Sequence, residues 1–210
     1  LSNPGVSPDA MVGIHVYSRS NTSGNVLSGN TVNNLRATTY MLNSTGYSTR
    51  VYGLGVGVAG ASSSASGTIE KNYVYDLNNN SGGSAPEVTA IVLASGSWQA
   101  NNNVVSVNNS LYSSRSPFIY GMQDWTVQGN NTGIYHNSIY IGGTLSSGNN
   151  SSYAYSRLPN ATGLVYGATV TLSNNIFFND RTGGSTNNIA IGNLTQGNST
   201  DAAVGWNSDY

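Results

Sequence analysis

The acidic side chains are the first candidates for chemistry, and the chain has only eight of them among its 210 residues. They are Asp9, Glu70, Asp76, Glu87, Asp124, Asp180, Asp201 and Asp209. Two carboxylates held a few ångströms apart could hydrolyse a glycosidic bond. A calcium-binding cluster of acids with a basic residue beside it could support a polysaccharide lyase reaction. Either reaction would depend on the fold to bring distant acids together.

The other reactive groups offer no second chemistry. There is no Cys, which removes disulfides, thiolate catalysis and thiolate zinc sites. The only imidazoles, His15 and His136, have no further ligands clustered near them in the sequence, so we expect hydrogen-bonded or solvated histidines. The letters GVGVAG at 55–60 match a dinucleotide fingerprint, but ASSSASG follows where that motif needs a helix. We therefore expect a strand here, and no catalytic residue, metal or cofactor in the chain.

The tyrosines are the remaining candidates, since the chain has 14 of them. Tyr40, Tyr47, Tyr153 and Tyr155 fall in segments between the repeated units described below. A ring with an apolar face and a polar tip can stack on a sugar or anchor a protein partner. Alternatively, these rings pack the intervening segments onto the scaffold. The sequence leaves both readings open, with surface glycans as the possible ligand.

Charge and composition limit the partners and the location. The net charge is −1, with seven basic and eight acidic residues scattered along the chain, so no basic patch could follow a phosphate backbone. No apolar run is long enough to insert into a membrane. Asn, Ser and Gly make up 87 residues while Lys and Glu are few, which favours a secreted, extracellular or cell-surface protein. The chain opens at Leu1 without a signal peptide, as a mature product or an excised piece would.

A repeated frame indicates which elements would position these groups. The frame is an apolar residue, two residues, Asn, one residue and another apolar residue. Its copies read LSGNTVNNL, IEKNYVYDL, ANNNVVSV, IYHNSIYI, LSNNIFF and a shortened VGWNSDY. The framing asparagines are Asn30, Asn72, Asn103, Asn137, Asn175 and Asn207. Their spacing, between 31 and 42 residues, suits one supersecondary unit per repeat.

A second apolar segment precedes most copies of the frame. These segments read GIHVYS, YGLGVGVAG, TAIVLASG, PFIYGM, TGLVYG and NNIAIGNL. None shows a helical period, so each unit holds two or more short strands. A sandwich would need hairpin turns that the sequence lacks, and a propeller blade would need four strands. We therefore predict one all-β domain, 1–210: a right-handed parallel β-helix of about six coils, with inserts at 36–50, 78–87 and 143–160.

The β-helix gives the framing asparagines a role. Asn tolerates left-handed backbone conformation better than other non-Gly residues, so each would occupy a corner between strands. Coils stacked about 4.8 Å apart would place these residues above one another, and their amides could form a hydrogen-bonded ladder.

The same frame separates the acids. Asp76 and Asp180 fall near equivalent positions about three coils apart, roughly 14 Å along the axis. We therefore expect no paired carboxylates and a protein that is not an enzyme.

Two of the repeats carry a resemblance to a known class of protein. The segments HNSIYIGGT and LSNNIFFNDRTGG resemble the right-handed parallel β-helix repeats of large secreted surface proteins of Bacteroidetes-like bacteria. The resemblance implies a β-solenoid outside the cell with an adhesive or envelope role. A glycan-binding or glycan-cleaving module is the alternative.

The two ends of the repeat predict how the protein associates. Neither end of the chain reads as the polar cap that closes a solenoid, and Asp209 occupies a position that is apolar in the earlier copies. Unpaired strands at such ends are templates for another chain. We expect either end-to-end self-association or continuation into the remainder of a longer solenoid.

Overall fold

The computed structural model contains strands and no helix in the residues that it describes. These are residues 10–17, 22–37, 42–43, 46–47, 50–57, 64–81, 86–108, 117–126, 129–145, 148, 150–157, 169–183, 187–193 and 206–209. Backbone alone is described for residues 10, 42–43, 46–47, 193 and 206–209.

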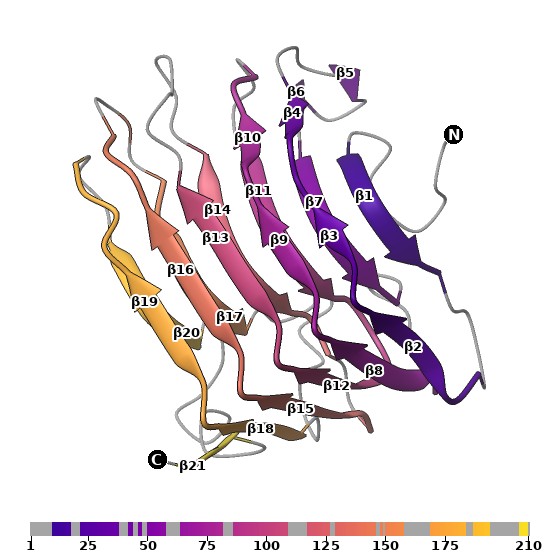
Figure 1. Ribbon diagram of the computed structural model, residues 1–210. Helices are drawn as coiled ribbons and strands as arrows, with labels where there is room; N and C mark the ends of the chain where they lie inside the picture. Colours follow the sequence, from indigo (N-terminus) through magenta and orange to yellow (C-terminus); the bar gives the residue numbers. More distant parts are fainter. Residues whose placement is uncertain are drawn as a thin grey trace.

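Three parallel sheets form the body of the molecule (Figure 1). Sheet A contains β1 (Ala10–Val16), β7 (Arg50–Val56), β11 (Glu87–Leu93), β14 (Phe118–Asp124), β17 (Ser152–Arg157) and β20 (Asn188–Asn193). Sheet B contains β2 (Asn25–Ser28), β8 (Ser66–Glu70), β12 (Ser97–Asn101), β15 (Asn131–Tyr135), β18 (Thr169–Ser173) and β21 (Trp206–Asp209). Sheet C contains β3 (Thr31–Val32), β9 (Tyr73–Tyr75), β13 (Val104–Asn108), β16 (Ser138–Gly142) and β19 (Ile176–Asn179).

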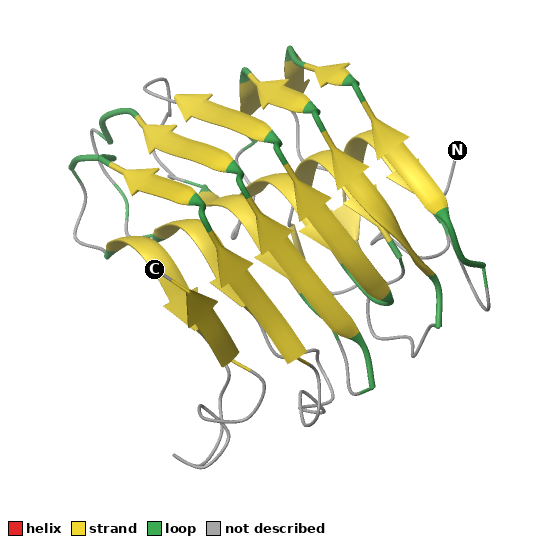
Figure 2. Ribbon diagram, turned by 60° about the horizontal axis from the view of Figure 1, so that its bottom comes forward, coloured by secondary structure: helices red, strands yellow, loops and turns green. Residues whose placement is uncertain are grey.

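The chain visits the sheets in the order A, B, C and then returns to A one strand further along. Figure 1 shows it descending the far sheet, crossing below and rising through the near sheet as it advances from right to left, which makes the coil right-handed. Figure 2 shows the strands of each sheet side by side and pointing the same way. The described residues form five three-sheet coils and the A and B strands of a sixth. The predicted parallel β-helix is confirmed.

Two smaller pairings accompany the coils. β4 (Leu35–Ala37) and β10 (Leu77–Asn79) pair in parallel after the first two sheet C strands. β5 (Leu42–Asn43) and β6 (Gly46–Tyr47) form an antiparallel pair.

Part of the predicted division into units and inserts was wrong. β17 lies within 143–160, which the sequence indicated to be an insert, and it supplies the sheet A strand of the fifth coil. The segment TGLVYG, which the sequence favoured for that role, lies outside the described residues. Which segment supplies this strand depends on the register with β14, where Tyr120 pairs with Tyr153 and Met122 with Tyr155. A single sequence does not display that register.

Side chains that point inward form columns along the axis. One column contains Leu54, Ile91, Met122 and Tyr155, and another contains Ile69, Ala100, Ile134 and Leu172. These eight residues are at most 4% exposed. Burial of each large aliphatic member stabilises the fold by about 1.5–3 kcal/mol. Because the columns run through every coil, a coil in the middle has its core completed by both neighbours.

The corner before sheet C has a different backbone from the one that the sequence predicted. The residue with positive φ is not the framing Asn but the residue immediately before it. These residues are Gly29 (68°), Lys71 (55°), Asn102 (53°), His136 (55°) and Asn174 (55°). The prediction that the framing Asn itself takes the left-handed conformation was therefore wrong, so the value of Asn there must lie in its side chain.

We predict that His136→Asn and Lys71→Gly stabilise the protein. A non-Gly residue in the left-handed region costs about 1–2 kcal/mol, less for Asn, and Gly adopts it freely at some cost in unfolded-state entropy. Each change should raise the free energy of unfolding by about 0.5–1 kcal/mol in denaturant titrations. Ser28→Asn, in strand β2, is the control and should give no gain. Equal gains at all three positions would contradict the backbone explanation.

Candidate functional site

Five asparagines, one from each of the first five coils, form a continuous ladder. They are Asn30, Asn72, Asn103, Asn137 and Asn175. In all four steps the Nδ2 amide donates to the Oδ1 of the next Asn at 2.9 Å. The backbone N–H of the same residue donates to that oxygen at 2.9–3.2 Å. The predicted ladder is confirmed for these residues.

The ladder asparagines also donate hydrogen bonds to the backbone of the preceding coil. The Nδ2 of Asn72, Asn103, Asn137 and Asn175 each donate to a carbonyl of the preceding sheet B strand at 2.7–2.9 Å. Each interior rung therefore joins three successive coils. Asn72, Asn103 and Asn137 are at most 1% exposed, so each of these bonds replaces hydration that burial has removed.

Asn207 does not occupy the predicted sixth rung. Strand β21 pairs with β18 so that Asn207 is opposite Thr171 and Ser208 is opposite Leu172. In the earlier coils the ladder Asn lies three residues after the residue equivalent to Leu172. The resemblance of VGWNSDY to the frame placed Asn207 wrongly by four positions, because a short degenerate match does not fix strand register.

Two of the four candidate contact tyrosines are buried and cannot contribute to a contact surface. Tyr153 and Tyr155 lie in strand β17, and their exposed fractions are 9% and 0%. Tyr153 stacks on Tyr120 with ring centroids 5.5 Å apart, and Tyr155 belongs to an interior column. Of the two readings that the sequence left open, packing onto the scaffold therefore holds for both rings. Tyr40 and the side chain of Tyr47 lie outside the described residues.

Tyr155 instead joins a polar cluster inside the core. Its hydroxyl donates to Asp124 Oδ2 at 3.3 Å, and the backbone N–H and hydroxyl of Thr126 donate to Asp124 Oδ1. Arg157, only 2% exposed, pairs with Asp124 in the strand register and attracts its carboxylate. Burial raises the pKa of Asp124, while Thr126 and Arg157 oppose that rise. The closed surroundings favour a structural role for this acid over acid–base work on a substrate.

A second acid, largely but not fully buried, lies at the start of strand β11 in sheet A. Glu87 accepts a hydrogen bond from Thr89 at 2.9 Å and forms an ion pair with Arg50 at 3.5 Å. Burial raises the pKa of Glu87, and the positive charge of Arg50 opposes the rise. Burial and, to a smaller extent, the carboxylate of Glu87 raise the pKa of the Tyr52 hydroxyl as well.

We predict that acidification from neutral pH stabilises the protein. The pKa values of Asp124 and Glu87 are raised above 3.8 and 4.5, their ordinary values, so the folded state keeps protons that the unfolded state has lost. The free energy of unfolding should therefore fall as pH rises from those ordinary values through the raised ones. Thermal melts at a series of pH values should show this slope, and Asp124→Asn should reduce it. A slope unchanged by Asp124→Asn would contradict the assignment.

The other candidate groups are dispersed. Asp76 forms an exposed ion pair with Arg36 at 3.1 Å, and Glu70 lies 3.9 Å from the ammonium of Lys71. His15 Nε2 lies 2.9 Å from the carbonyl oxygen of Gly57, and burial lowers the pKa of this imidazole. In the part of the chain that the structure describes, no group of three or more metal-binding side chains comes together. None of its segments is a helix that could cross a membrane.

The fingerprint-like segment 55–60 begins in a strand, as predicted, while residues 58–60 lie outside the described residues. Gly55 belongs to β7, and Gly57 follows it with φ of 77°. A side chain on Gly55 would meet the ring of His15 at 2.9 Å, and one on Gly57 would meet the backbone of Ser95 at 2.5 Å. These glycines admit close neighbours from adjacent coils.

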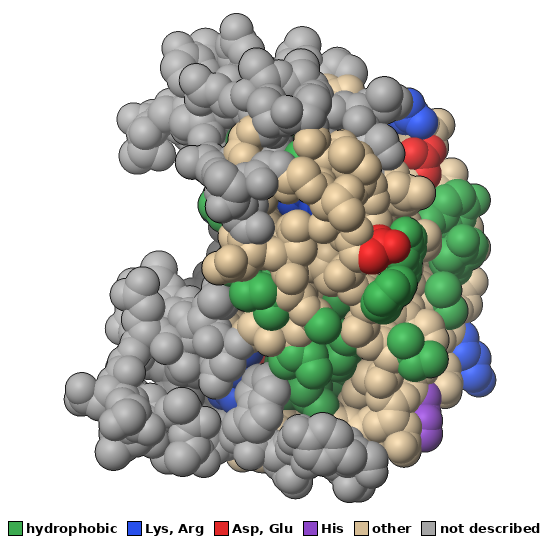
Figure 3. Space-filling view, turned by 90° about the vertical axis from the view of Figure 1, so that its left-hand side faces the viewer, with side chains coloured by type: hydrophobic (Ala, Val, Ile, Leu, Met, Phe, Trp, Pro, Cys, Tyr) green, Lys and Arg blue, Asp and Glu red, His purple; other side chains and the backbone are tan. Residues whose placement is uncertain are grey.

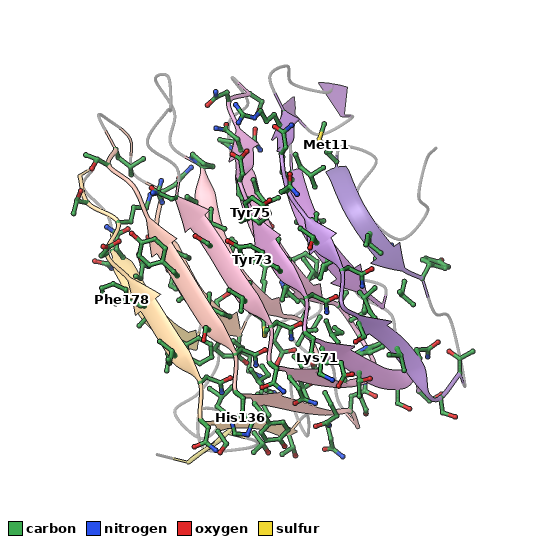
Figure 4. The ribbon with its side chains drawn as sticks, in the orientation of Figure 1. Met11, Lys71, Tyr73, Tyr75, His136 and Phe178 are labelled. Atoms are coloured by element: carbon green, nitrogen blue, oxygen red, sulfur yellow. The ribbon has the colours of Figure 1, made fainter. Side chains whose placement is uncertain are left out.

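The outer face of sheet C is the one described surface with a concentration of large apolar side chains. It carries Tyr73, Tyr75, Val104, Tyr140, Ile176 and Phe178, which alternate along their strands with buried residues. We call these six residues the aromatic face. Tyr73, Val104, Ile176 and Phe178 are 42–65% exposed. Figure 4 shows Tyr73 and Tyr75 on β9 and Phe178 on β19.

Contacts within the aromatic face hold its rings in place. Tyr73 and Tyr75 stack with centroids 4.4 Å apart, and Tyr140 stacks with Phe178 at 5.8 Å. The Tyr140 ring lies over Gly142, where any added Cβ would be 2.3 Å from the hydroxyl. A hydrogen bond to Asp180 and, to a smaller extent, burial raise the pKa of Tyr140. A partial signal for this face was present in the sequence, because six of the ten residues that lie one or three places after the five ladder asparagines are large and apolar.

Comparison with known proteins finds no matching family model, no similar curated protein and no similar solved structure. Any assignment of function therefore depends on the surfaces and contacts described above.

Proposed function

We propose that this chain is a non-catalytic structural and adhesive module of an extracellular β-solenoid. The observation that carries the proposal is that, among the described residues, the core is left partly uncovered at the C-terminal end. Ile191 continues the interior column of Met122 and Tyr155, yet it is 46% exposed where those two residues are fully buried. Figure 3, which views this end, shows hydrophobic side chains in the end surface. A further coil would cover them.

The first coil has the same property. Met11, Ile14 and Val16 pack on the core but are only partly buried, in contrast to Val51, Leu54 and Val56 of the next coil. All strands of the three sheets run in parallel, so the exposed edge of the first coil and that of the last are complementary to each other.

The Asn ladder gives such stacking a direction. Every step runs from an amide donor to the Oδ1 of the next higher-numbered Asn. A coil placed before Asn30 would donate to its Oδ1, and a coil placed after Asn175 would accept from its backbone N–H. A second copy of the chain, or the remainder of a longer solenoid, would supply that coil in a head-to-tail orientation.

The proposed extracellular location is supported by the composition and by the resemblance of the repeats to those of secreted bacterial surface proteins. A chain with 15 charged residues and no Cys is compatible with that setting. The uncharged aromatic face supports an adhesive role for the sides of the rod.

Sedimentation velocity and negative-stain electron microscopy of the 210-residue chain test the stacking. We expect rods that lengthen with protein concentration, and Ile191→Asp should shift them to monomers by placing a charge in the end surface. Thr171→Asp, on the outer face of sheet B, is the matched control and should leave assembly unchanged. Monomers throughout the concentration range, or equal loss with both variants, would contradict end-to-end stacking.

A glycan-binding role is the second candidate, because the aromatic face presents tyrosine rings and hydroxyls together. Glycan cleavage has less support in the described residues, where the carboxylate of Asp124 is buried, Glu87 is largely buried and paired with Arg50, and Asp76 is paired with Arg36.

A further inference from the structure

We infer that the aromatic face binds a neutral polysaccharide chain. This inference rests on the proposed adhesive function and names the partner of the surface. Its starting point is that the fold does not require apolar side chains there. Sheet B has the same parallel geometry, yet its outward positions include polar residues such as Thr68, Gln99 and Thr171. Sheet B also presents Val26 and Tyr135 outward, but most of its outward positions are polar, whereas sheet C carries all six residues of the aromatic face. An exposed apolar cluster of this kind marks a contact surface.

The rings form two platforms rather than a uniform apolar layer. The Tyr73–Tyr75 pair lies on β9, and the Tyr140–Phe178 pair spans β16 and β19. Strand β13 separates them, and its Ser106 pairs with both Tyr75 and Tyr140. At the usual strand spacing the two platforms are about 10 Å apart along the solenoid axis. An extended ligand with repeated faces could contact both at once.

Polar groups are interleaved with these rings. Ser106 and Ser138 are half-buried outward residues of the same face, and three of the four rings carry hydroxyls. The Tyr140 hydroxyl is hydrogen-bonded to Asp180, but a purely hydrophobic protein contact would offer no partner to the other hydroxyls of the face, which costs free energy. A sugar chain satisfies both requirements, since its C–H faces can stack on rings while its hydroxyls form hydrogen bonds at the edges.

The charge distribution indicates that the ligand is neutral. None of the described outward residues of sheet C strands is charged. The charged groups nearby lie at its borders, where Asp180 follows β19 and the Lys71–Glu70 pair precedes β9. An anionic glycan would find no counter-charge within the platforms, so binding should depend little on salt.

Affinity electrophoresis and pull-down with defined polysaccharides test the inference. The probes are insoluble cellulose and chitin, soluble xyloglucan and mannan, and anionic alginate. We expect binding to at least one neutral probe, retained in 1 M NaCl, with little retention on alginate. Tyr73→Ala and Phe178→Ala should each weaken it about tenfold, as loss of a central aromatic contact does. Tyr73→Phe should bind more tightly than Tyr73→Ala because it keeps the ring.

Thr68→Ala and Thr171→Ala, on the outer face of sheet B, are matched controls and should bind as the wild type does. Melting temperatures of all variants establish that they are folded. Binding to none of the neutral probes, binding to alginate alone, or equal weakening by the sheet B variants would overturn the inference. So would a dimer that Tyr73→Ala dissociates, since a second copy would then occupy the face. The end-stacking assay with Ile191→Asp is read separately, so failure of glycan binding leaves the structural proposal intact.

Discussion

Asn103→Ala should cause one of the largest losses of stability that a single substitution can produce in this protein, about 3–5 kcal/mol. The side chain of Asn103 is fully buried, donates to Asn137 Oδ1 and Ile69 O, and accepts from the backbone and side-chain amides of Asn72. Truncation removes the acceptor of the Asn72 backbone N–H and leaves other buried polar atoms with fewer partners. Each buried group left unsatisfied costs about 1–3 kcal/mol.

Chemical denaturation followed by far-ultraviolet circular dichroism would measure this loss. Asn30→Ala is the matched control, because Asn30 is the first rung, is partly exposed and contacts the ladder on one side only. It should cost about 1 kcal/mol, as the loss of a typical hydrogen bond does. Similar losses at the two positions would show that the ladder does not stabilise the fold through its interior rungs.

The second large effect concerns the buried charges in the core. Arg157→Met should destabilise the protein by about 3–5 kcal/mol, because it leaves the carboxylate of Asp124 inside the solenoid without its cation. The double variant Arg157→Met, Asp124→Asn should recover most of that loss. Asn at position 124 keeps an Oδ1 acceptor for Thr126, which donates to Asp124 in the native protein. Leu93, Asp124 and Arg157 occupy equivalent positions in three successive coils, so an apolar Met at position 157 would resemble Leu93.

A double-mutant cycle on unfolding free energies makes the comparison quantitative. The coupling between the two positions should exceed about 2 kcal/mol, within the range for directly interacting buried groups. The single variant Asp124→Asn provides the third corner of the cycle. Additive losses would mean that Asp124 and Arg157 are stabilised by separate surroundings and do not stabilise each other.

Several features of the fold could be predicted from the spacing of residue types alone. The recurrence of Asn with apolar neighbours every 31–42 residues predicted the coil, its parallel strands and five of the six proposed ladder residues. These features are visible in a sequence because each is repeated, so that one coil supports the interpretation of the next. The left-handed residue was misplaced by one position because Lys71 and His136 at those positions are not residues that favour such a backbone.

The candidate surfaces were harder to predict. Tyr153 and Tyr155 were expected on an exposed insert, whereas pairing with β14 makes them part of a strand whose two faces are both buried. Asp124 and Arg157 are in equivalent positions of neighbouring coils, but the 32 residues between them include an insert of irregular length. A single sequence does not specify how many residues such an insert contributes to the coil.

The sequence by itself therefore determined the architecture, namely a parallel coil with an amide ladder. Only the tertiary structure decided which tyrosines are buried, that Asn207 is out of register, and that one sheet carries an exposed aromatic face. The physical reason is that the ladder and core depend on a local pattern that recurs in every coil. Exposure and register depend on which strands become neighbours, and irregular inserts let strands far apart in the chain meet without leaving a periodic signal.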